Sequence, residues 1–501
     1  MHRFDPIGRG GSARLVMFSA MVARRGVSPC VPRLAILVLA GLAVCGLAGC
    51  SAEESLPAEG VATPPPTAYY DLAAEAGDWI RSQVIESDLG PIWPDDASDP
   101  DSASIGLGVG VSGTTLFFLE LARAGGDGQW MSEVRRGSDW LLASLPDSLE
   151  ASSLASPVEA AGLYRGWSGA GVVLHRVFLA TGDSTYLDGA HRAVDLVVES
   201  AQVEGRGVSW NVYNEVMRGN AGTGLFLLYA AREMDRPDAA LTARDAARTL
   251  LARSFPDSGG VNWLMREDKD FILPNFSHGA AGIGYFLATA GRQLTEDSPE
   301  DAASFAAAAE DAAGYLTRIA RVDSLGALVI PYGYPRDEWR EWNELGWAHG
   351  PGGTSRFFYR VGELTGDPQY TEMVDGCARA IVTSGAPDNV TPRFAEALSP
   401  DRRFGLAGAA AFLFSLYEFF GDEDHKEAAL RITDHLAAQA ETDREGRRWV
   451  MEQPAFFPNP GQDARYTGYF YGTAGYGLLL LQADAVLRGL EWTPGLPDSP
   501  F

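Results

Sequence analysis

Hydrophobic residues recur along this chain in two different helical patterns. Segments such as "TTLFFLELARAGG" and "AAFLFSLYEFFGD" are apolar on nearly every face and stop near a glycine, as helices that end in a left-handed glycine do. Segments such as "YLDGAHRAVDLVVESA" and "HKEAALRITDHLAAQA" are apolar only every three or four positions. Because the two patterns alternate and strand signals are sparse, the sequence predicts an all-α protein whose first kind of helix forms an inner layer.

Each apolar segment follows the same short phrase, Gly-x-x-Gly. The seven phrases begin at Gly110, Gly166, Gly219, Gly279, Gly350, Gly405 and Gly472. Their first glycines are 56, 53, 60, 71, 55 and 67 residues apart, and a phrase repeated at such spacing indicates a repeat architecture. We expect these glycines to begin the inner helices, where they would allow a positive φ and the close approach of a neighbouring helix.

Seven helix pairs can stack as an open solenoid or close into a ring. A closed ring leaves no end repeats that need polar caps, whereas an open array does. The sequence therefore favours an α/α toroid of seven helical hairpins over residues 68–488, with the solenoid as the alternative and residues 489–501 as a C-terminal tail.

The first 49 residues are typical of a signal peptide. Arg24, Arg25 and Arg33 precede an apolar run of 16 residues, which is shorter than the roughly 20 residues of a membrane-spanning helix. The run ends in "LAGC", which resembles the lipobox of bacterial lipoproteins and implies that Cys50 is lipidated. The alternative is an ordinary secretory signal, and the mass of the native N-terminus distinguishes the two.

This interpretation places the protein in the cell envelope, in contact with the membrane only through its lipid. The residue after Cys50 is Ser51 and not an Asp, which would signal retention in the inner membrane. If the cell has two membranes, we therefore expect the protein to be anchored in the outer membrane and to face the periplasm. Residues 50–67 are polar and rich in proline, which predicts a disordered tether. The start codon stays open between Met1 and Met21.

Composition and charge exclude one class of partner. The chain has 501 residues, 46% of them hydrophobic and 21% charged, which is typical of a globular protein with a large core. Its net charge of -26 repels phosphate backbones, so we expect no nucleic-acid partner. Apart from Cys50, the exported chain keeps only Cys377, which lies on the apolar face of a helical pattern and is predicted to be a packed core thiol.

The repeated phrases carry a family resemblance. "SHGAAG" in the fourth phrase, a Trp-x-x-Gly in the fifth and "YFYGTAGYGLLLL" in the seventh resemble the lanthionine synthetase C-like family. The resemblance covers roughly residues 68–488 and implies the α/α toroid fold. It also implies peptide cyclisation, in which a Cys thiolate adds to a dehydrated Ser or Thr with the help of a zinc ion held by two Cys and one His.

This chain lacks the zinc ligands that the resemblance implies. The three matching positions hold Ala348, Arg403 and Phe404, none of which supplies a thiolate or an imidazole. We therefore expect no cofactor and a metal-free rim. His278 matches the family's proton-transfer histidine, so His278 and the nearby His349 are the catalytic candidates. Each can instead be structural, by packing or by bonding loop carbonyls.

The loops before the Gly-x-x-Gly phrases supply further binding candidates. Aromatic rings, carboxylates and arginines are interleaved there, as suits peptide or sugar recognition, although the same residues also suit packing between helices. The predicted binding residues are Glu215, Asn275, Glu344, Trp347, Asp463, Arg465 and Tyr466, together with Asn214 and Trp342. The other helical histidines are predicted to be surface or core residues: His175, His191, His425 and His435.

Three function classes remain open on these grounds. The first is an exported lanthionine synthetase C-like lipoprotein with a peptide- or glycan-binding bowl and without zinc-dependent thioether cyclisation. The second is a carbohydrate-active enzyme, a glycosidase or lyase, on the same architecture. The third is a non-catalytic scaffold of the envelope. Fold alone does not choose between them.

Overall fold

A computed structural model describes residues 65–126, 128–150, 160–270, 272–333, 344–388, 399–453, 459–492 and 494–500. All of them belong to the second of two compact units, Thr63–Phe501. The predicted signal segment, Cys50, Trp342 and most of the tether lie outside the described residues. None of the helices in the described ranges is long and apolar enough to cross a membrane.

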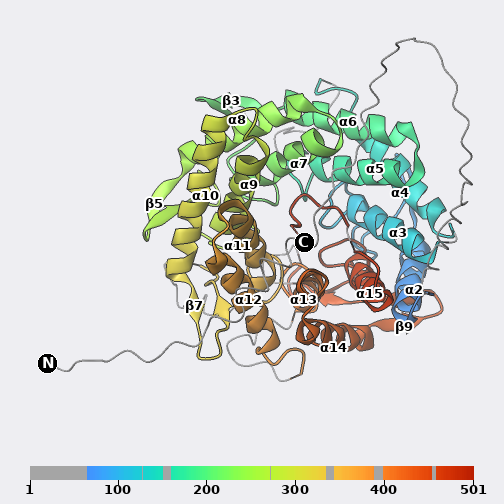
Figure 1. The fold of residues 1–501 in the computed structure, drawn as a ribbon. Helices are drawn as coiled ribbons and strands as arrows, with labels where there is room; N and C mark the ends of the chain where they lie inside the picture. Colours follow the sequence, from blue (N-terminus) through green and yellow to red (C-terminus); the bar gives the residue numbers. More distant parts are fainter. Residues whose placement is uncertain are drawn as a thin grey trace, which may run out of the picture. The chain divides into compact units, whose positions relative to one another are not determined.

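Fourteen helices form two concentric layers in the described part of the chain (Figure 1). The inner helices are α3 (Val111–Gly125), α5 (Trp167–Thr181), α7 (Asn220–Glu233), α9 (Ala280–Gln293), α11 (Pro351–Thr365), α13 (Leu406–Phe420) and α15 (Thr473–Arg488). The outer helices are α2 (Ala68–Ser82), α4 (Met131–Ser144), α6 (Ser184–Glu199), α8 (Pro237–Arg253), α10 (Pro299–Ile319), α12 (Pro368–Val382) and α14 (Glu423–Gln439).

The first and last helices close the ring. Six hairpins pair an inner helix with the outer helix that follows it, from α3 with α4 to α13 with α14. The seventh pair joins α15 to α2, and α15 also packs against α3. The α/α toroid of seven helical hairpins is therefore confirmed, and the open-solenoid alternative is wrong.

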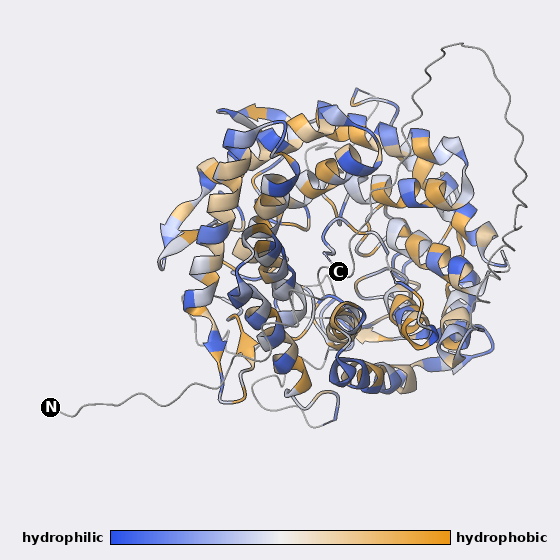
Figure 2. Ribbon diagram, in the orientation of Figure 1, coloured by the Kyte–Doolittle hydropathy of each residue, from blue (hydrophilic) through white to orange (hydrophobic). Residues whose placement is uncertain are grey.

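Burial separates the two layers as the hydrophobic patterns predict. In α9, 12 of 14 residues are buried, whereas in its outer partner α10 only 9 of 21 are. Hydrophilic residues recur along the outer helices in Figure 2, as they do on helices with one face in water. Cys377 is a buried free thiol of α12, as predicted.

Every inner helix begins at a Gly-x-x-Gly phrase, and the first glycine of each phrase is its N-cap. The predicted positive φ is wrong, because these seven residues have φ between -95° and -143°. Glycine is needed at these positions because the backbone of the preceding loop comes very close to them. A Cβ atom on Gly279 would lie 1.3 Å from the carbonyl oxygen of Leu273, and one on Gly282 would lie 2.0 Å from that of Phe276.

Helix ends also follow the sequence signals. Five inner helices stop at a left-handed glycine, for example α5 at Gly182, with φ of 70°. After three of these glycines the next residue is an Asp that caps the following outer helix: Asp183, Asp367 and Asp422. The carboxylate of Asp183, for example, accepts from the N–H of Thr185. The Gly-Asp pairs therefore turn the chain from the inner to the outer layer.

Six short antiparallel strand pairs lie before loops that lead inward, and five of them directly follow an outer helix, whereas the sixth follows β10. They are β1 (Ile85–Ser87) with β2 (Gly90–Ile92), β3 (Gln202–Glu204) with β4 (Gly207–Ser209), β5 (Phe255–Asp257) with β6 (Gly260–Asn262), β7 (Arg321–Val322) with β8 (Leu328–Val329), β9 (Glu441–Asp443) with β10 (Gly446–Arg448), and β11 (Met451–Glu452) with β12 (Asp463–Ala464). No larger sheet occurs in the described ranges.

The seven loops before the inner helices bond to one another through their backbones, and we call them the loop ring. The N–H to carbonyl bonds run from Gly108 to Tyr164, Tyr164 to Met217, Val216 to Ser277, Ser277 to Ala348, Ala348 to Arg403, Arg402 to Phe470 and Phe470 to Gly108. The last bond, of 2.7 Å, returns to the first loop. The loops are thereby fixed relative to one another, as a ligand site requires.

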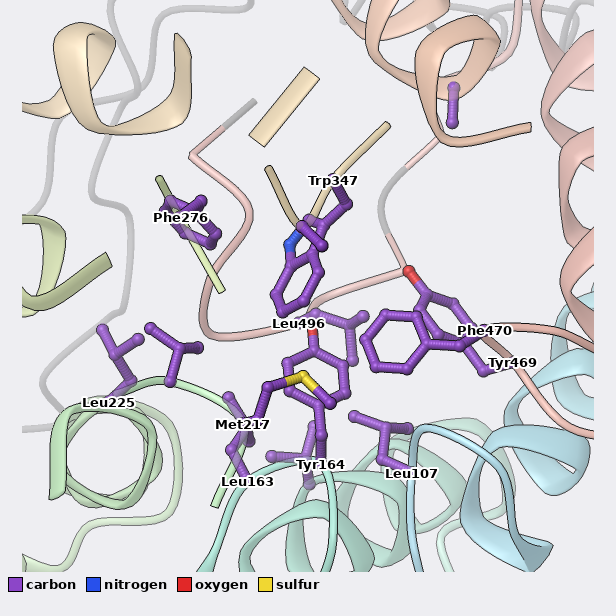
Figure 3. Close-up of a cluster of buried hydrophobic side chains, with 14 of the residues drawn as sticks. Leu107, Leu163, Tyr164, Met217, Leu225, Phe276, Trp347, Tyr469, Phe470 and Leu496 are labelled. Carbon is purple, nitrogen blue, oxygen red and sulfur yellow. The ribbon is translucent and has the colours of Figure 1, made fainter. Parts of the chain in front are cut away.

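Hydrophobic side chains of the loop ring meet the C-terminal tail inside the barrel. Tyr164, Trp347 and Phe470 pack together with Leu496 of the tail (Figure 3). Asp498 is fully buried there, and its Oδ2 accepts hydrogen bonds from the hydroxyl of Tyr164 and the indole N–H of Trp347, both at 2.9 Å. The tail is therefore part of the core.

Candidate functional site

The candidate site lies on the loop ring, at residues next to the N-caps of the inner helices. Its members come from the loops that lead into α5, α7, α9, α13 and α15, which are far apart in the sequence. We call the following residues the rim cluster: Arg165, Glu215, Arg218, His278, Arg403 and Tyr471.

Glu215 and His278 form the centre of the rim cluster. The Nδ1 atom of His278 lies 2.6 Å from Oε2 of Glu215. The Glu215 side chain has no exposed surface and also accepts the backbone N–H groups of Met217 and Arg218, at 3.0 and 2.8 Å. Burial alone would raise the pKa of Glu215, but His278 and these donors outweigh it and hold the pKa below its usual range. Glu215 is therefore an ionised carboxylate.

Arg403 fixes the protonation of His278. Its Nη2 lies 3.0 Å from Nε2 of His278, and its Nη1 donates to the hydroxyl of Tyr471. A guanidinium can only donate, so Nε2 is the acceptor and Nδ1 carries the proton that bonds to Glu215. Burial lowers the pKa of His278, and the charges of Arg403 and Arg218 add to this effect against Glu215. The imidazole is therefore neutral, with its basic nitrogen turned to Arg403.

The residues at the implied zinc position do not fit a zinc ion. The methyl group of Ala348 and the ring of Phe404 supply no ligand, and the guanidinium of Arg403 places a positive charge beside His278. Within the described residues, no three His, Cys, Asp or Glu side chains are grouped so that they could hold a metal.

His349 lies beside the rim cluster as a buried neutral imidazole. Its ring centroid is 5.4 Å from that of His278 and 4.3 Å from that of Tyr332. Its Nε2 is 3.5 Å from the hydroxyl of Ser277, while its Nδ1 has no hydrogen-bond partner among the described residues. Burial, with the added repulsion of the Arg403 charge, lowers the pKa of His349 well below its usual value. His349 therefore carries no charge at neutral pH.

Glu344 is a buried carboxyl near Arg403 whose uncharged form is favoured. Burial raises the pKa of Glu344 well above its usual value, and the neighbouring Asp401 raises it further, against the charge of Arg403. Its Oε2 is buried without a hydrogen-bond partner among the described residues. Asp401 has a raised pKa as well, again because it is buried. Burial thus favours the uncharged form of both carboxyl groups near Arg403.

Replacing Glu344 by glutamine is expected to leave stability unchanged near pH 4.5 and to raise it at pH 8. The folded carboxyl keeps its proton at pH values where the unfolded chain has lost it, so the wild type loses stability as the pH rises above 4.5. Glutamine resembles the protonated acid and does not titrate. The gain should be about 1.4 kcal/mol for each unit between the folded and unfolded pKa values.

Chemical denaturation of both proteins at the two pH values measures this gain. Glu86→Gln, on the exposed side of β1, is the control and should show the same small difference at both pH values. If Glu344→Gln behaves like the control, the carboxyl is ionised in the folded protein and our interpretation is wrong.

The other predicted binding residues lie in different surroundings. Asn275 is buried, donating to the carbonyl of Pro331 and accepting from the hydroxyl of Thr354. Trp347 points into the barrel interior, toward Asp498 and away from solvent (Figure 3). Their polar groups are therefore already bonded within the protein.

Three predicted binding residues come from one segment of the chain but lie at different distances from His278: Asp463, Arg465 and Tyr466. Asp463 is exposed on β12, and Arg465 is 3.9 Å from Glu441, so neither is brought to His278 by a described contact. Tyr466 is closer to the site, because its ring is 6.0 Å from that of Tyr471. Asn214, another predicted rim residue, binds the carbonyl of Leu264 and the carboxylate of Glu267.

Sequence reasoning missed Arg165, Arg218 and Tyr471, and noted Arg403 only as a missing zinc ligand. A signal was present. Residues immediately before the first glycines of the seven phrases form one column of equivalent positions, and four rim residues stand in it: Arg165, Arg218, His278 and Tyr471. Aligning the phrases with one another would have brought these residues together.

Comparisons with known proteins agree with this architecture. The profile of a family described as "Lanthionine synthetase C-like protein" matches residues 101–392. The structure of nisin cyclase is similar, with a TM-score of 0.56 and 13% sequence identity over 85% of this chain and 96% of that one. No curated protein sequence matches significantly.

Two further solved structures show lower similarity. A protein of Listeria innocua has a TM-score of 0.47 and 11% identity over 85% of this chain and 100% of its own. An inactive variant of an α-1,6-mannanase of Salegentibacter, in complex with α-1,6-mannotriose, has a TM-score of 0.44 and 12% identity over 84% and 99%.

Proposed function

This chain belongs to the lanthionine synthetase C-like family, and on that premise we propose that its rim cluster binds a peptide and exchanges a proton with it through His278. Zinc-assisted thioether formation is not part of the proposal, since Ala348, Arg403 and Phe404 stand where ligands would be needed. The single observation that carries the proposal is the position of His278 between Glu215 and Arg403.

This arrangement makes His278 a base that a ligand can switch on. In the free protein, Arg403 occupies the lone pair of Nε2 at 3.0 Å. A polar ligand group that bonds to Arg403 competes for its N–H donors and leaves Nε2 free to accept a proton. The imidazolium that forms is stabilised by the carboxylate of Glu215, 2.6 Å from Nδ1. A histidine oriented by a buried carboxylate is a common general base.

A peptide ligand is favoured over a glycan by family membership. The resemblance to that family implies peptide cyclisation, and the fold of nisin cyclase is similar. The carbohydrate-active alternative is supported by one feature, the buried carboxyl of Glu344, whose pKa is raised and whose Oε2 has no hydrogen-bond partner among the described residues, because such a group can act as a general acid. Glu215 is unsuitable as the second carboxyl group of such an enzyme, since its carboxylate already accepts hydrogen bonds from three groups of the protein.

Binding to a panel of short peptides and oligosaccharides, with His278→Gln as the variant, tests this proposal. We expect the wild type to bind peptides from the panel and His278→Gln to lose at least about tenfold in affinity, which corresponds to about 1.4 kcal/mol. His435→Gln, on the half-exposed face of α14, is the matched control and should bind like the wild type.

Three outcomes would contradict the proposal. Equal binding by wild type and His278→Gln removes the role of the imidazole. Binding of oligosaccharides alone transfers the function to the carbohydrate-active alternative. Elemental analysis that finds about one zinc per purified chain would show that the rim holds a metal after all.

A further inference from the structure

We propose that the rim ligand carries an oxyanion, a carboxylate or a phosphate, which is received by Arg165, Arg218 and Arg403. This inference rests on the proposed function, because it names the ligand group that the rim recognises. It goes further in assigning a binding role to two arginines, Arg165 and Arg218, which neither the sequence patterns nor the family resemblance single out.

The three guanidinium groups lie together although they come from different loops. Arg165 precedes α5, Arg218 precedes α7 and Arg403 precedes α13. Although the outer surface of Arg165 is exposed, surrounding protein atoms are the largest cause of its lowered pKa, and the charges of Arg218 and Arg403 are the next. Arg165 is exposed, Arg218 is half-buried and Arg403 is 8% exposed. Positive charge therefore extends from the surface down to His278.

Internal partners leave these arginines only partly satisfied. The side chains of Arg165 and Arg218 form no ion pair with a described residue, and the Nε atoms of Arg218 and Arg403 are buried without a hydrogen-bond partner in the described ranges. Of Arg403, only Nη1 and Nη2 are bonded, to the neutral groups of Tyr471 and His278. Buried guanidinium donors without partners are costly, and an oxyanion would bond to them directly.

The carboxyl groups around the cluster do not cancel its charge. Burial raises the pKa of Asp95, near Arg165, to about 7, although Ser104 and Arg165 oppose the shift. Glu344 and Asp401, near Arg403, also have raised pKa values because they are buried. Glu215 is the ionised carboxylate among them, and three N–H groups already use it. Burial therefore weakens the negative charge of the carboxyl groups nearest to the three arginines, in a chain whose net charge is -26.

The inner helices add to this positive potential. All seven begin at the loop ring, and none of them has an acidic residue in its first turn or a side chain bonded at its N-cap. By contrast, outer helices such as α10 and α14 carry two acidic residues in the first turn. No acidic side chain in the first turn therefore offsets the positive ends of the inner helix dipoles. These ends lie on the face that holds the three arginines, so they favour the binding of an anion there.

Binding of defined oxyanion probes to the full-length protein tests this inference. The probes are N-acetyl-triglycine with a free C-terminal carboxylate, the same peptide as its amide, and inorganic phosphate, each titrated at low and high salt. We expect the wild type to bind one or both oxyanions more tightly than the amide, and the binding to weaken with salt. The relative affinity of the carboxylate and of phosphate identifies the source of the oxyanion.

Arg165→Gln is the informative variant, because an exposed side chain can be replaced without disturbing the core. It should weaken oxyanion binding about tenfold, while Arg232→Gln, an arginine on the outer end of α7 with 57% exposure, should not. Failure of the wild type to bind any oxyanion, or an unchanged affinity in Arg165→Gln, overturns the inference.

The same data separate this inference from the proposed function. If the amide binds as well as the carboxylate and His278→Gln abolishes both, the peptide function stands and the oxyanion role is wrong. If inorganic phosphate binds through Arg165 but no peptide of the panel does, the oxyanion site stands and the proposed function is wrong.

Discussion

Replacing Gly282 by valine is expected to lower the free energy of unfolding by roughly 3 kcal/mol or more, enough to unfold a protein of ordinary stability. Gly282 is the second glycine of the fourth phrase, in the first turn of α9. A Cβ atom there would lie 2.0 Å from the carbonyl oxygen of Phe276 and 2.6 Å from a methyl group of Val216. The carbonyl belongs to the backbone of the loop ring, so it cannot move aside as the end of a side chain can.

The effect at Gly282 should spread to the site, because the clashing loop carries His278. Thermal and chemical unfolding measure the loss, and Gly282→Ala should already show most of it. Gly314→Ala in α10 is the matched control, since its Cβ would meet only the carbonyl of Gly259 at an ordinary 3.6 Å. Alanine there should be neutral or slightly stabilising, as usual for helix interiors. A wild-type melting temperature in Gly282→Ala would show that the phrase does not require glycine for close approach.

Replacing Asp498 by alanine is expected to be similarly damaging, at about 3 kcal/mol. The carboxylate is fully buried, and besides Tyr164 and Trp347 it binds Nη1 of Arg356 at 3.1 Å. Alanine removes the acceptor of three donors at once and leaves the Arg356 charge without this partner in the barrel. Unsatisfied donors of this kind cost more than the bonds themselves contributed.

Urea denaturation of Asp498→Ala measures this loss. Asp463→Ala on exposed β12 is the control for the removal of an aspartate and should be within about 0.5 kcal/mol of the wild type. Asn at position 498 keeps a carbonyl acceptor but loses the charge, so it should lie between alanine and the wild type. A wild-type stability of the alanine variant would mean that the tail does not hold the loop ring in place.

The charge of the rim differs from that of the molecule as a whole. A net charge of -26 predicts repulsion of anions, yet Arg165, Arg218 and Arg403 concentrate positive charge around His278 and Glu215. Composition describes the average surface, whereas recognition depends on a few side chains. The net charge of the whole chain therefore does not indicate which ligand the rim cluster would bind.

The sequence by itself determined the repeating unit of this protein. Helical periodicity, glycine stops and the seven Gly-x-x-Gly phrases are local signals, since each depends on residues within one or two turns of each other. They predicted the inner helix starts, the ends at residues such as Gly182, and the buried character of the inner layer. The family resemblance, in turn, implied that Ala348, Arg403 and Phe404 stand where zinc ligands would be expected.

Only the tertiary structure decided how the units close and what the rim contains. Closure depends on α2 and α15 at opposite ends of the chain and on the bond from Phe470 to Gly108, which no local pattern specifies. The contact of Arg403 with His278 joins residues 125 positions apart. Asp498, on a tail that carries no helical signal, reaches the centre of the barrel. Periodicity specifies the face of a helix that is buried, whereas its neighbour in space follows from the packing of the whole ring.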